Sequence, residues 1–329
     1  MNPLLTREIG KTGLKVTRLG VGGAPFSRLS GAEGEKLATE SIKKALDLGI
    51  RFFDTAPMYG AGKSELYYSR VLEDEVRSEY VLSSKVGRVL NPSKSTSNAG
   101  DAYLNLPPLD MEFDFSRDGI LRSIEDSLER LKLDRIDILF IHDPDDYHEQ
   151  AVKEAFPALS DLRSQGVIKA IGAGMNYWEP LADFAVECDF DCFILAGRYT
   201  LLDHSGLLKL LPLCEEKNIS VILGGPYNSG VLASDLSDEG TTYFYKNTPI
   251  EILETAKKIK TICDRYSVPL KAAALQFGLS HPAVAATIPG ALKASEVAEN
   301  FEMVQFPIPK DLWGELKREK LIPQSAPTD

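Results

Sequence analysis

Four side chains that can move or stabilise a proton stand at or just after the ends of short apolar segments. Asp54, Lys85 and His142 each end such a segment, and Tyr59 follows Asp54 by five residues. Taken singly, each has an ordinary explanation, as a turn residue, a lysine with a buried stem, a satisfied histidine or a packed tyrosine. Their occurrence at three successive segment ends favours a shared chemical role.

The chemistry that these four residues predict is general acid/base catalysis. A tyrosine has a pKa of about 10, which is too high for easy proton transfer at neutral pH. A nearby ammonium group favours the phenolate and lowers that pKa. Lys85 can supply the charge, Asp54 can hold Lys85, and His142 can hydrogen-bond the substrate oxygen or relay a proton. Such catalysis contributes about 10²–10⁴ in rate, so we predict that Tyr59 is the acid/base acting on a carbonyl or alcohol.

The elements that must position these residues alternate between short apolar runs and helical patterns, as in an α/β fold. We expect eight buried parallel strands, at 19–22, 51–54, 80–85, 136–142, 167–172, 192–195, 219–223 and 284–288. An amphipathic stripe predicts a helix over 116–132 with Ser116 as its N-cap. Similar patterns predict helices at 37–48, 151–163, 207–216, 252–263 and 269–280.

Two arrangements of these elements compete, a closed (β/α)8 barrel and an open doubly wound sheet. The open sheet favours a glycine-rich G-x-G-x-x-G turn directly before a helix. The segment 19–25 does not fit, because Pro25 and the loop after it delay the helix. We therefore expect a single-domain (β/α)8 TIM barrel over residues 1–329, with an N-terminal β-hairpin over 7–16 and long loops, 88–113 and 224–249, at its C-terminal face.

The composition limits the partners of this chain. The net charge of −11 argues against nucleic acid or an anionic membrane. The first twenty residues carry charges throughout, and no run of about 18 apolar residues occurs, so we expect neither a signal peptide nor a membrane span. The four cysteines form no C-x-x-C pair and predict neither a disulfide framework nor a metal site. We expect a cytoplasmic monomer or homodimer that acts on a small molecule.

Several stretches resemble the aldo-keto reductase family, and together they cover nearly the whole chain in the order of that family. They are 49–60, 82–87, 131–142, 166–176, 288–290 and 299–300. The resemblance implies a barrel that binds NAD or NADP across its C-terminal mouth. It implies a catalytic tetrad of Asp54, Tyr59, Lys85 and His142, and implies that Asn176 binds the nicotinamide carboxamide. Other cofactor contacts that it implies are Gly22, Asp54, Arg198, Gly224, Pro226, Asn228, Gly290, Glu296 and Asn300.

A narrower resemblance points to a substrate class. The stretches 113–123, 142–146, 195–203 and 224–230 are similar to a subgroup of dehydrogenases that act on D-threo-aldoses, L-fucose, L-galactose or pyridoxal. It implies oxidation of a cyclic hemiacetal to a lactone. Expected substrate contacts are Met58, Arg88, Trp178 and Tyr227, with Asn91, Tyr199 and Asn228 as further pocket candidates. The alternatives are a general NADPH-dependent aldehyde or ketone reductase and a cofactor-binding regulatory subunit without turnover.

Three departures from the wider family concern the cofactor. Ala196 stands where many relatives have a glutamine that helps to hold the carboxamide, and Gly224 stands where many have an aromatic ring. Around the position of the 2′-phosphate of NADP, lysine, serine and arginine are replaced by Gly290, Ala291 and Glu296, with Lys293 as a nearby cation. A carboxylate repels a phosphate. We therefore expect a preference for NAD, unless Glu296 points into solvent and has no influence.

Overall fold

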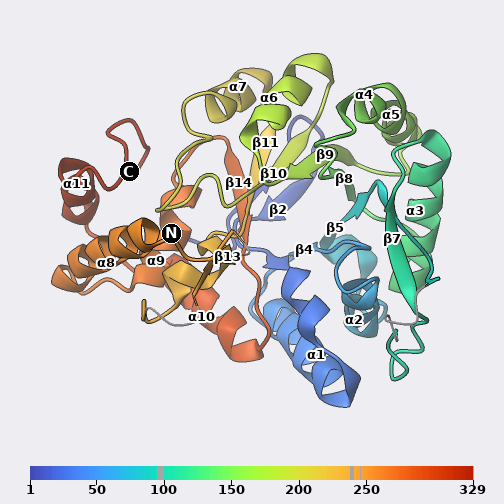
Figure 1. Cartoon of the computed structure of the whole chain (residues 1–329), viewed down its shortest axis with the longest axis horizontal. Helices are drawn as coiled ribbons and strands as arrows, with labels where there is room; N and C mark the ends of the chain where they lie inside the picture. The colour runs from blue at the N-terminus through green and yellow to red at the C-terminus, as the bar shows by residue number, and fades with distance from the viewer. Residues whose placement is uncertain (95–99, 238–240, 245, 329) are drawn as a thin grey trace.

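The computed structural model describes residues 1–94, 100–237, 241–244 and 246–328. Eight parallel strands gather at its centre with helices around them (Figure 1). They are β3 (Val21–Gly22), β4 (Phe52–Asp54), β5 (Val81–Val86), β8 (Ile138–His142), β9 (Ala170–Met175), β10 (Cys192–Ala196), β11 (Ser220–Gly224) and β14 (Val284–Ile288). All eight expected strands are present. The strand expected at 167–172 is displaced, since β9 begins at Ala170.

The first and last strands close the sheet into a barrel. The backbone N–H of Gly20 donates to the carbonyl of Thr287 at 2.9 Å, and that of Gly22 donates to Pro289 at 3.2 Å. Gly22 and Gly290 face each other at this seam. A Cβ on Gly22 would lie 2.8 Å from the carbonyl oxygen of Ile288, so the seam requires glycine there. The expected (β/α)8 barrel is confirmed.

Helices cover the strands from outside. They are α1 (Gly31–Asp47), α2 (Lys63–Leu72), α3 (Arg117–Leu131), α4 (His148–Gln150), α5 (Phe156–Ser164), α6 (Trp178–Glu187), α7 (Leu210–Lys217), α8 (Ile250–Arg265), α9 (Leu270–Leu279), α10 (Ala294–Gln305) and α11 (Lys310–Arg318). Short 3-10 or π turns span Ala24–Arg28, Arg77–Glu79, Ala151–Ala155 and Asn228–Ala233. Ser116 is the N-cap of α3, as expected, and its Oγ accepts the N–H of Gly119 at 3.1 Å. Among the described helices, none is both long and apolar enough to cross a membrane.

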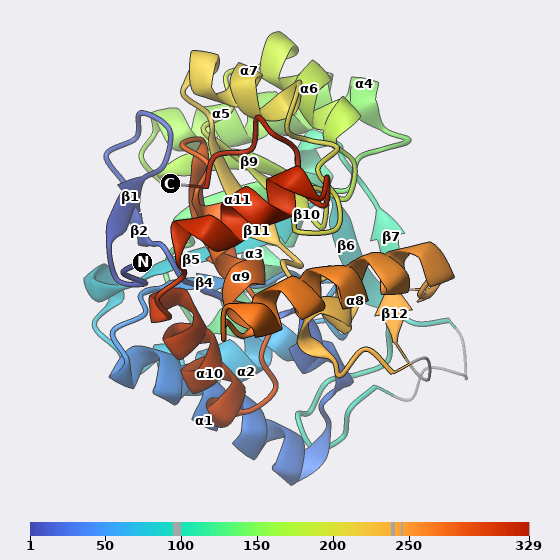
Figure 2. The ribbon, with the colours of Figure 1, turned by 90° about the vertical axis from the view of Figure 1, so that its left-hand side faces the viewer.

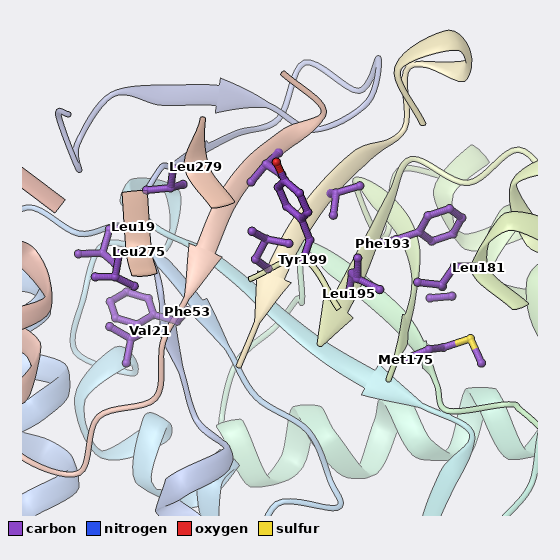
Figure 3. Close-up of a cluster of buried hydrophobic side chains, with 14 of the residues drawn as sticks. Leu19, Val21, Phe53, Met175, Leu181, Phe193, Leu195, Tyr199, Leu275 and Leu279 are labelled. Atoms are coloured by element: carbon purple, nitrogen blue, oxygen red, sulfur yellow. The ribbon is translucent and has the colours of Figure 1, made fainter. Parts of the chain in front are cut away.

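Two apolar layers hold this arrangement. One lies between the strands and the helices, and Figure 3 shows part of it. The other fills the inside of the barrel with side chains such as Phe52 and Phe140. The expected N-terminal hairpin, β1 (Thr6–Glu8) with β2 (Lys15–Thr17), adds the fully buried Ile9 and the nearly buried Val16 to this inner layer. Figure 2 shows the hairpin beside the strands, with α8 and α11 crossing the outside of the molecule.

The two long loops carry structure of their own. The segment 88–113 forms an antiparallel hairpin of β6 (Arg88–Pro92) and β7 (Leu109–Phe113), directly after β5. The segment 224–249 follows β11 and contains a second small hairpin, β12 (Thr242–Tyr243) with β13 (Lys246–Asn247). Both loops thus follow C-terminal strand ends, where active sites of such barrels form.

Candidate active site

Lys85 and Asp54 form a buried ion pair at the C-terminal ends of β5 and β4. The distance from Lys85 Nζ to Asp54 Oδ2 is 2.7 Å, and both residues are 2% exposed. Lys85 also donates to the carbonyl oxygen of Thr55 at 2.9 Å, while Ser83 Oγ donates to the other oxygen of Asp54 at 2.8 Å. Burial alone lowers the pKa of Lys85, but the charge of Asp54 and the contact with Tyr59 outweigh it and raise that pKa. The lysine is therefore held as an ammonium ion.

Tyr59 and His142 complete the expected tetrad. The ammonium of Lys85 lies 4.7 Å from the ring centre of Tyr59, and the two side chains are hydrogen-bonded. The rings of Tyr59 and His142 meet edge to face, with their centres 5.9 Å apart. Burial, followed by the charges of Lys85 and Arg88, holds the pKa of His142 well below its usual range. The site thus combines a phenol beside a fixed cation with a neutral imidazole.

Arg88 and Asp143 form a second ion pair beside His142. Arg88 Nη2 lies 2.5 Å from Asp143 Oδ2, and the same oxygen is 3.7 Å from Nε2 of His142. Asp143 has a left-handed backbone (φ 44°), which costs free energy in a residue other than glycine and is common at functional sites. The sequence reasoning singled out Arg88 but missed Asp143. The position of Asp143 directly after His142, at the end of a strand, could have indicated it as a site residue.

The hairpin of β6 and β7 places apolar side chains beside Arg88. Arg88 contacts the sulfur of Met58 at 2.9 Å and that of Met111 at 3.7 Å, and its guanidinium carbon lies 4.8 Å from the ring centre of Phe113. Phe113 packs in turn against Tyr147, with ring centres 5.2 Å apart. Because these methionine and aromatic side chains are each more than a third exposed, they offer apolar surface next to the polar pair.

Comparison with known proteins identifies the family of this chain. Residues 18–319 match the model of the aldo/keto reductase family. The chain belongs to that family. An aldo-keto reductase uses a nicotinamide cofactor, so this barrel is an NAD(P)-dependent oxidoreductase, as expected from the sequence.

Its relatives include dehydrogenases of similar length. The chain is 38% identical to a D-threo-aldose 1-dehydrogenase of a Pseudomonas species, over 94% of this chain and 96% of that protein. It is 36% identical to a pyridoxal 4-dehydrogenase of Microbacterium luteolum (96% and 97%) and 31% identical to an L-galactose dehydrogenase of Arabidopsis thaliana (92% and 89%). The holo form of an aldo-keto reductase from Bacillus halodurans shares the fold, with a TM-score of 0.77 at 24% identity over 98% of each chain.

The residues expected to bind the nicotinamide follow the ends of β9, β10 and β11. Ala196 and Gly224 are paired residues of β10 and β11, so the two departures noted in the sequence are neighbours. Asn176 comes directly after β9, and its carbonyl oxygen accepts a hydrogen bond from Arg198 at 3.1 Å. Asn228 donates to the carbonyl of Gly197 at 3.2 Å.

The residues at the ends of β9, β10 and β11 fit a nicotinamide dinucleotide. The side-chain oxygen of Asn228 is buried and has no hydrogen-bond partner within the described part of the chain, which suits a polar ligand group. Gly224 and Gly225 present bare backbone next to it, followed by the buried Pro226. Ala196, the pairing partner of Gly224, adds only a methyl group there. These residues and Asn176 are therefore the candidates for holding the cofactor.

The residues expected at the other end of the cofactor lie around α10. The carboxylate of Glu296 accepts the backbone N–H of Leu292 at 2.7 Å, so it turns back over the loop before the helix instead of extending into solvent. Asn300 accepts a hydrogen bond from the phenol of Tyr227 at 2.7 Å. Tyr227, expected as a substrate contact, is thus hydrogen-bonded to α10.

Other substrate candidates have contacts with residues outside the tetrad. Trp178 begins α6, and the ammonium of Lys209 lies 5.6 Å from its ring centre. Tyr199 is buried in the apolar layer outside the strands (Figure 3), and Asn91 is paired with Glu112 across the β6–β7 hairpin. The structure therefore brings Met58 and Arg88 together next to Asp143 and His142.

Proposed function

We propose that this aldo-keto reductase oxidises the cyclic hemiacetal of an aldose to a lactone. The observation that carries the proposal is a second polar pair, Arg88 with Asp143, next to the tetrad. A reductase of simple aldehydes needs polar groups only at the reacting oxygen. A sugar carries several hydroxyl groups and needs more polar partners, and the names of the similar dehydrogenases support this class.

Tyr59 acts as the base in this reaction. When bound, the nicotinamide supplies the acceptor for the hydrogen and two electrons that leave C1. Tyr59 takes the proton of the anomeric hydroxyl, and the ammonium of Lys85 stabilises the phenolate that does so. Asp54 keeps Lys85 charged and in place. In the reverse direction, reduction of a carbonyl, Tyr59 gives up the same proton.

His142 orients the reacting oxygen. Because its low pKa keeps the imidazole neutral, one ring nitrogen carries a hydrogen and the other accepts. Nδ1 is buried without a hydrogen-bond partner among the described residues, and Nε2 is the ring nitrogen proposed to meet the substrate. A neutral imidazole adds no further positive charge beside Lys85.

Arg88 and Asp143 are proposed to bind the hydroxyl groups next to the reacting carbon. An ionised carboxylate accepts hydrogen bonds from two hydroxyls, and the guanidinium donates to others. Burial raises the pKa of Asp143, and the charge of Arg88 opposes that rise. Replacement of Asp143 by asparagine therefore reduces the acceptor capacity but nearly keeps the shape of the side chain.

A second candidate substrate is pyridoxal in its hemiacetal form. The exposed aromatic surface of Phe113 and Tyr147 favours it, because flat rings stack on each other. An aldose uses the polar pair more fully than pyridoxal does. The relative turnover of an aldose and of pyridoxal therefore separates these two candidate substrates.

The proposed cofactor preference is for NAD over NADP. The carboxylate of Glu296 accepts the N–H of Leu292, and Glu296 stands where the resemblance to the family implies an arginine that meets the 2′-phosphate. A carboxylate at that place repels a phosphate. The comparison of kcat/KM for NAD+ and NADP+ tests this preference. Glu296→Arg should shift the ratio toward NADP+ by at least tenfold, and a higher kcat/KM for NADP+ in the unmodified enzyme contradicts it.

A substrate panel tests the whole proposal. We expect NAD+-dependent oxidation of L-fucose, L-galactose or D-arabinose to exceed both oxidation of pyridoxal and NADPH-dependent reduction of 4-nitrobenzaldehyde. Tyr59→Phe should abolish turnover, with cofactor binding nearly unchanged, because only the ionisable oxygen is removed. Turnover retained in this variant shows that another group moves the proton. Tight cofactor binding without any turnover of the panel favours the regulatory-subunit alternative.

A further inference from the structure

Arg198, in the loop after β10, is bound by residues of two other segments. Its Nε–H donates to the carbonyl oxygen of Asn176 at 3.1 Å, and Nη1 lies 2.7 Å from Asp203 Oδ2. The side chain of Arg198 is 19% exposed and that of Asp203 is 13% exposed. The arginine therefore fixes the backbone of the residue that follows β9, from a neighbouring loop.

The hairpin after β11 packs against Arg198. The guanidinium carbon lies 3.8 Å from the ring centre of Phe244 and 5.3 Å from that of Tyr177. The residue before Phe244 is Tyr243, and burial together with the charge of Asp203 and a hydrogen bond to it raises the pKa of this phenol. The Arg198–Asp203 pair thus binds the hairpin residues Tyr243 and Phe244 by a cation–π contact and a hydrogen bond.

The other end of β10 offers a similar pair with a different role. Arg163 lies 2.7 Å from Asp191, and their side chains are 22% and 12% exposed. Asp191 accepts the backbone N–H of Ile171 and precedes β10, so this pair joins strands and a helix at the N-terminal end of the barrel. Burial and geometry are nearly equal in the two pairs. What differs is that Arg198 lies between a cofactor candidate, Asn176, and the hairpin at the mouth.

We propose that Arg198 is a positioning residue that joins Asn176 and the β12–β13 hairpin into one unit, which retains the nicotinamide cofactor. The inference rests on the proposed function only in that the cofactor binds at Asn176. Ala196 and Gly224 lack the side chains with which many members of the family hold the nicotinamide. Asn176 therefore has fewer neighbouring side chains that bind the same group. Arg198 compensates by fixing Asn176 through its carbonyl group, and its contact with Phe244 makes release of the cofactor depend on the hairpin.

The test compares Arg198→Met with Arg163→Met. Trp178 lies two residues after Asn176, so protein fluorescence should report NAD+ binding and release in a stopped-flow instrument. We expect NAD+ to dissociate about tenfold faster from Arg198→Met, because a desolvated cation–π contact and a charged hydrogen bond are lost. Arg163→Met should dissociate within twofold of the unmodified rate, although both variants lose an ion pair of similar burial.

Two further variants separate positioning from simple loss of stability. Phe244→Leu should also speed NAD+ release, and this variant carries the test if Arg198→Met does not fold. The part of the Arg198 effect that runs through Asn176 should disappear when Asn176 is already alanine, while the part that runs through Phe244 remains. If the fold-change in NAD+ release rate of the double variant equals the product of the fold-changes of Arg198→Met and Asn176→Ala, the inference is overturned. An unchanged release rate in Arg198→Met or Phe244→Leu overturns it as well. Failure of the unmodified protein to bind NAD+ or NADP+ overturns the proposed function as well.

Discussion

Replacement of Lys85 by methionine tests the electrostatic basis of the catalytic proposal. The substitution keeps most of the apolar stem and removes an ammonium that lies 4.7 Å from the ring centre of Tyr59. At an effective dielectric constant of about 20, two unit charges at that separation interact by about 3.5 kcal/mol. Each 1.36 kcal/mol corresponds to a factor of ten in rate, so we expect kcat/KM to fall by about 10²–10³.

The same substitution also affects stability, and the two effects must be separated. Lys85→Met leaves the carboxylate of Asp54 buried without its partner, which costs about 3–5 kcal/mol of unfolding free energy. The double variant Lys85→Met/Asp54→Asn removes both charges and should recover most of that loss, but not the activity. Arg130→Met is a matched control, because Arg130 pairs at 2.7 Å with the buried Glu65 outside the site. It should lower stability and leave kcat/KM within twofold.

Steady-state oxidation over a pH series, together with urea unfolding of each variant, measures both effects. In the double variant we expect the rise of kcat/KM with pH to move to higher pH, because no cation favours the phenolate. A double variant that is folded and keeps kcat/KM within fivefold of the unmodified enzyme, at every pH, refutes the idea that Lys85 promotes ionisation of Tyr59.

Two further predictions concern stability. Ser116→Ala should lower the free energy of unfolding by about 1 kcal/mol, because the N–H of Gly119 loses its cap; urea unfolding measures this, and an unchanged midpoint contradicts it. His281 has a pKa lowered to about 4 by burial, whereas an unfolded histidine titrates near 6.5. Between these pH values the unfolded chain binds more protons, so the free energy of unfolding falls as the pH drops from about 6.5 to 4. His281→Asn should make this dependence on pH shallower in thermal unfolding measured over a pH series. An equal dependence on pH in both proteins contradicts the prediction.

The strands could be predicted from the sequence because most of them are continuous apolar runs. The displaced strand shows where that signal fails. β9 runs through Gly172, Ala173 and Gly174, which carry little hydrophobic signal. A Cβ on Gly172 would overlap the ring of Phe140, which fills the barrel at that level. Glycine at position 172 is therefore required by a side chain of the neighbouring strand β8, and only the three-dimensional structure shows this requirement.

The tetrad could be predicted because strand ends of a barrel converge at one rim, whatever their spacing along the chain. Pairs between loops follow no such rule. Arg88 and Asp143 are 55 residues apart, and Arg198 contacts Phe244 from a loop that follows a different strand. The antiparallel pairing of β6 with β7 was also missed, because the sequence between the two strands carries no clear turn signal that predicts a hairpin.

The seam between β3 and β14 has a consequence for synthesis of the protein on the ribosome. β3 is among the first strands to be made, and its second neighbour is made only with residues 284–288. At about 5–20 residues per second, the nascent sheet keeps an unpaired edge for on the order of tens of seconds. Open edges pair with other chains. Fragments that end before β14 should therefore aggregate in the cell, even though they contain every residue of the tetrad.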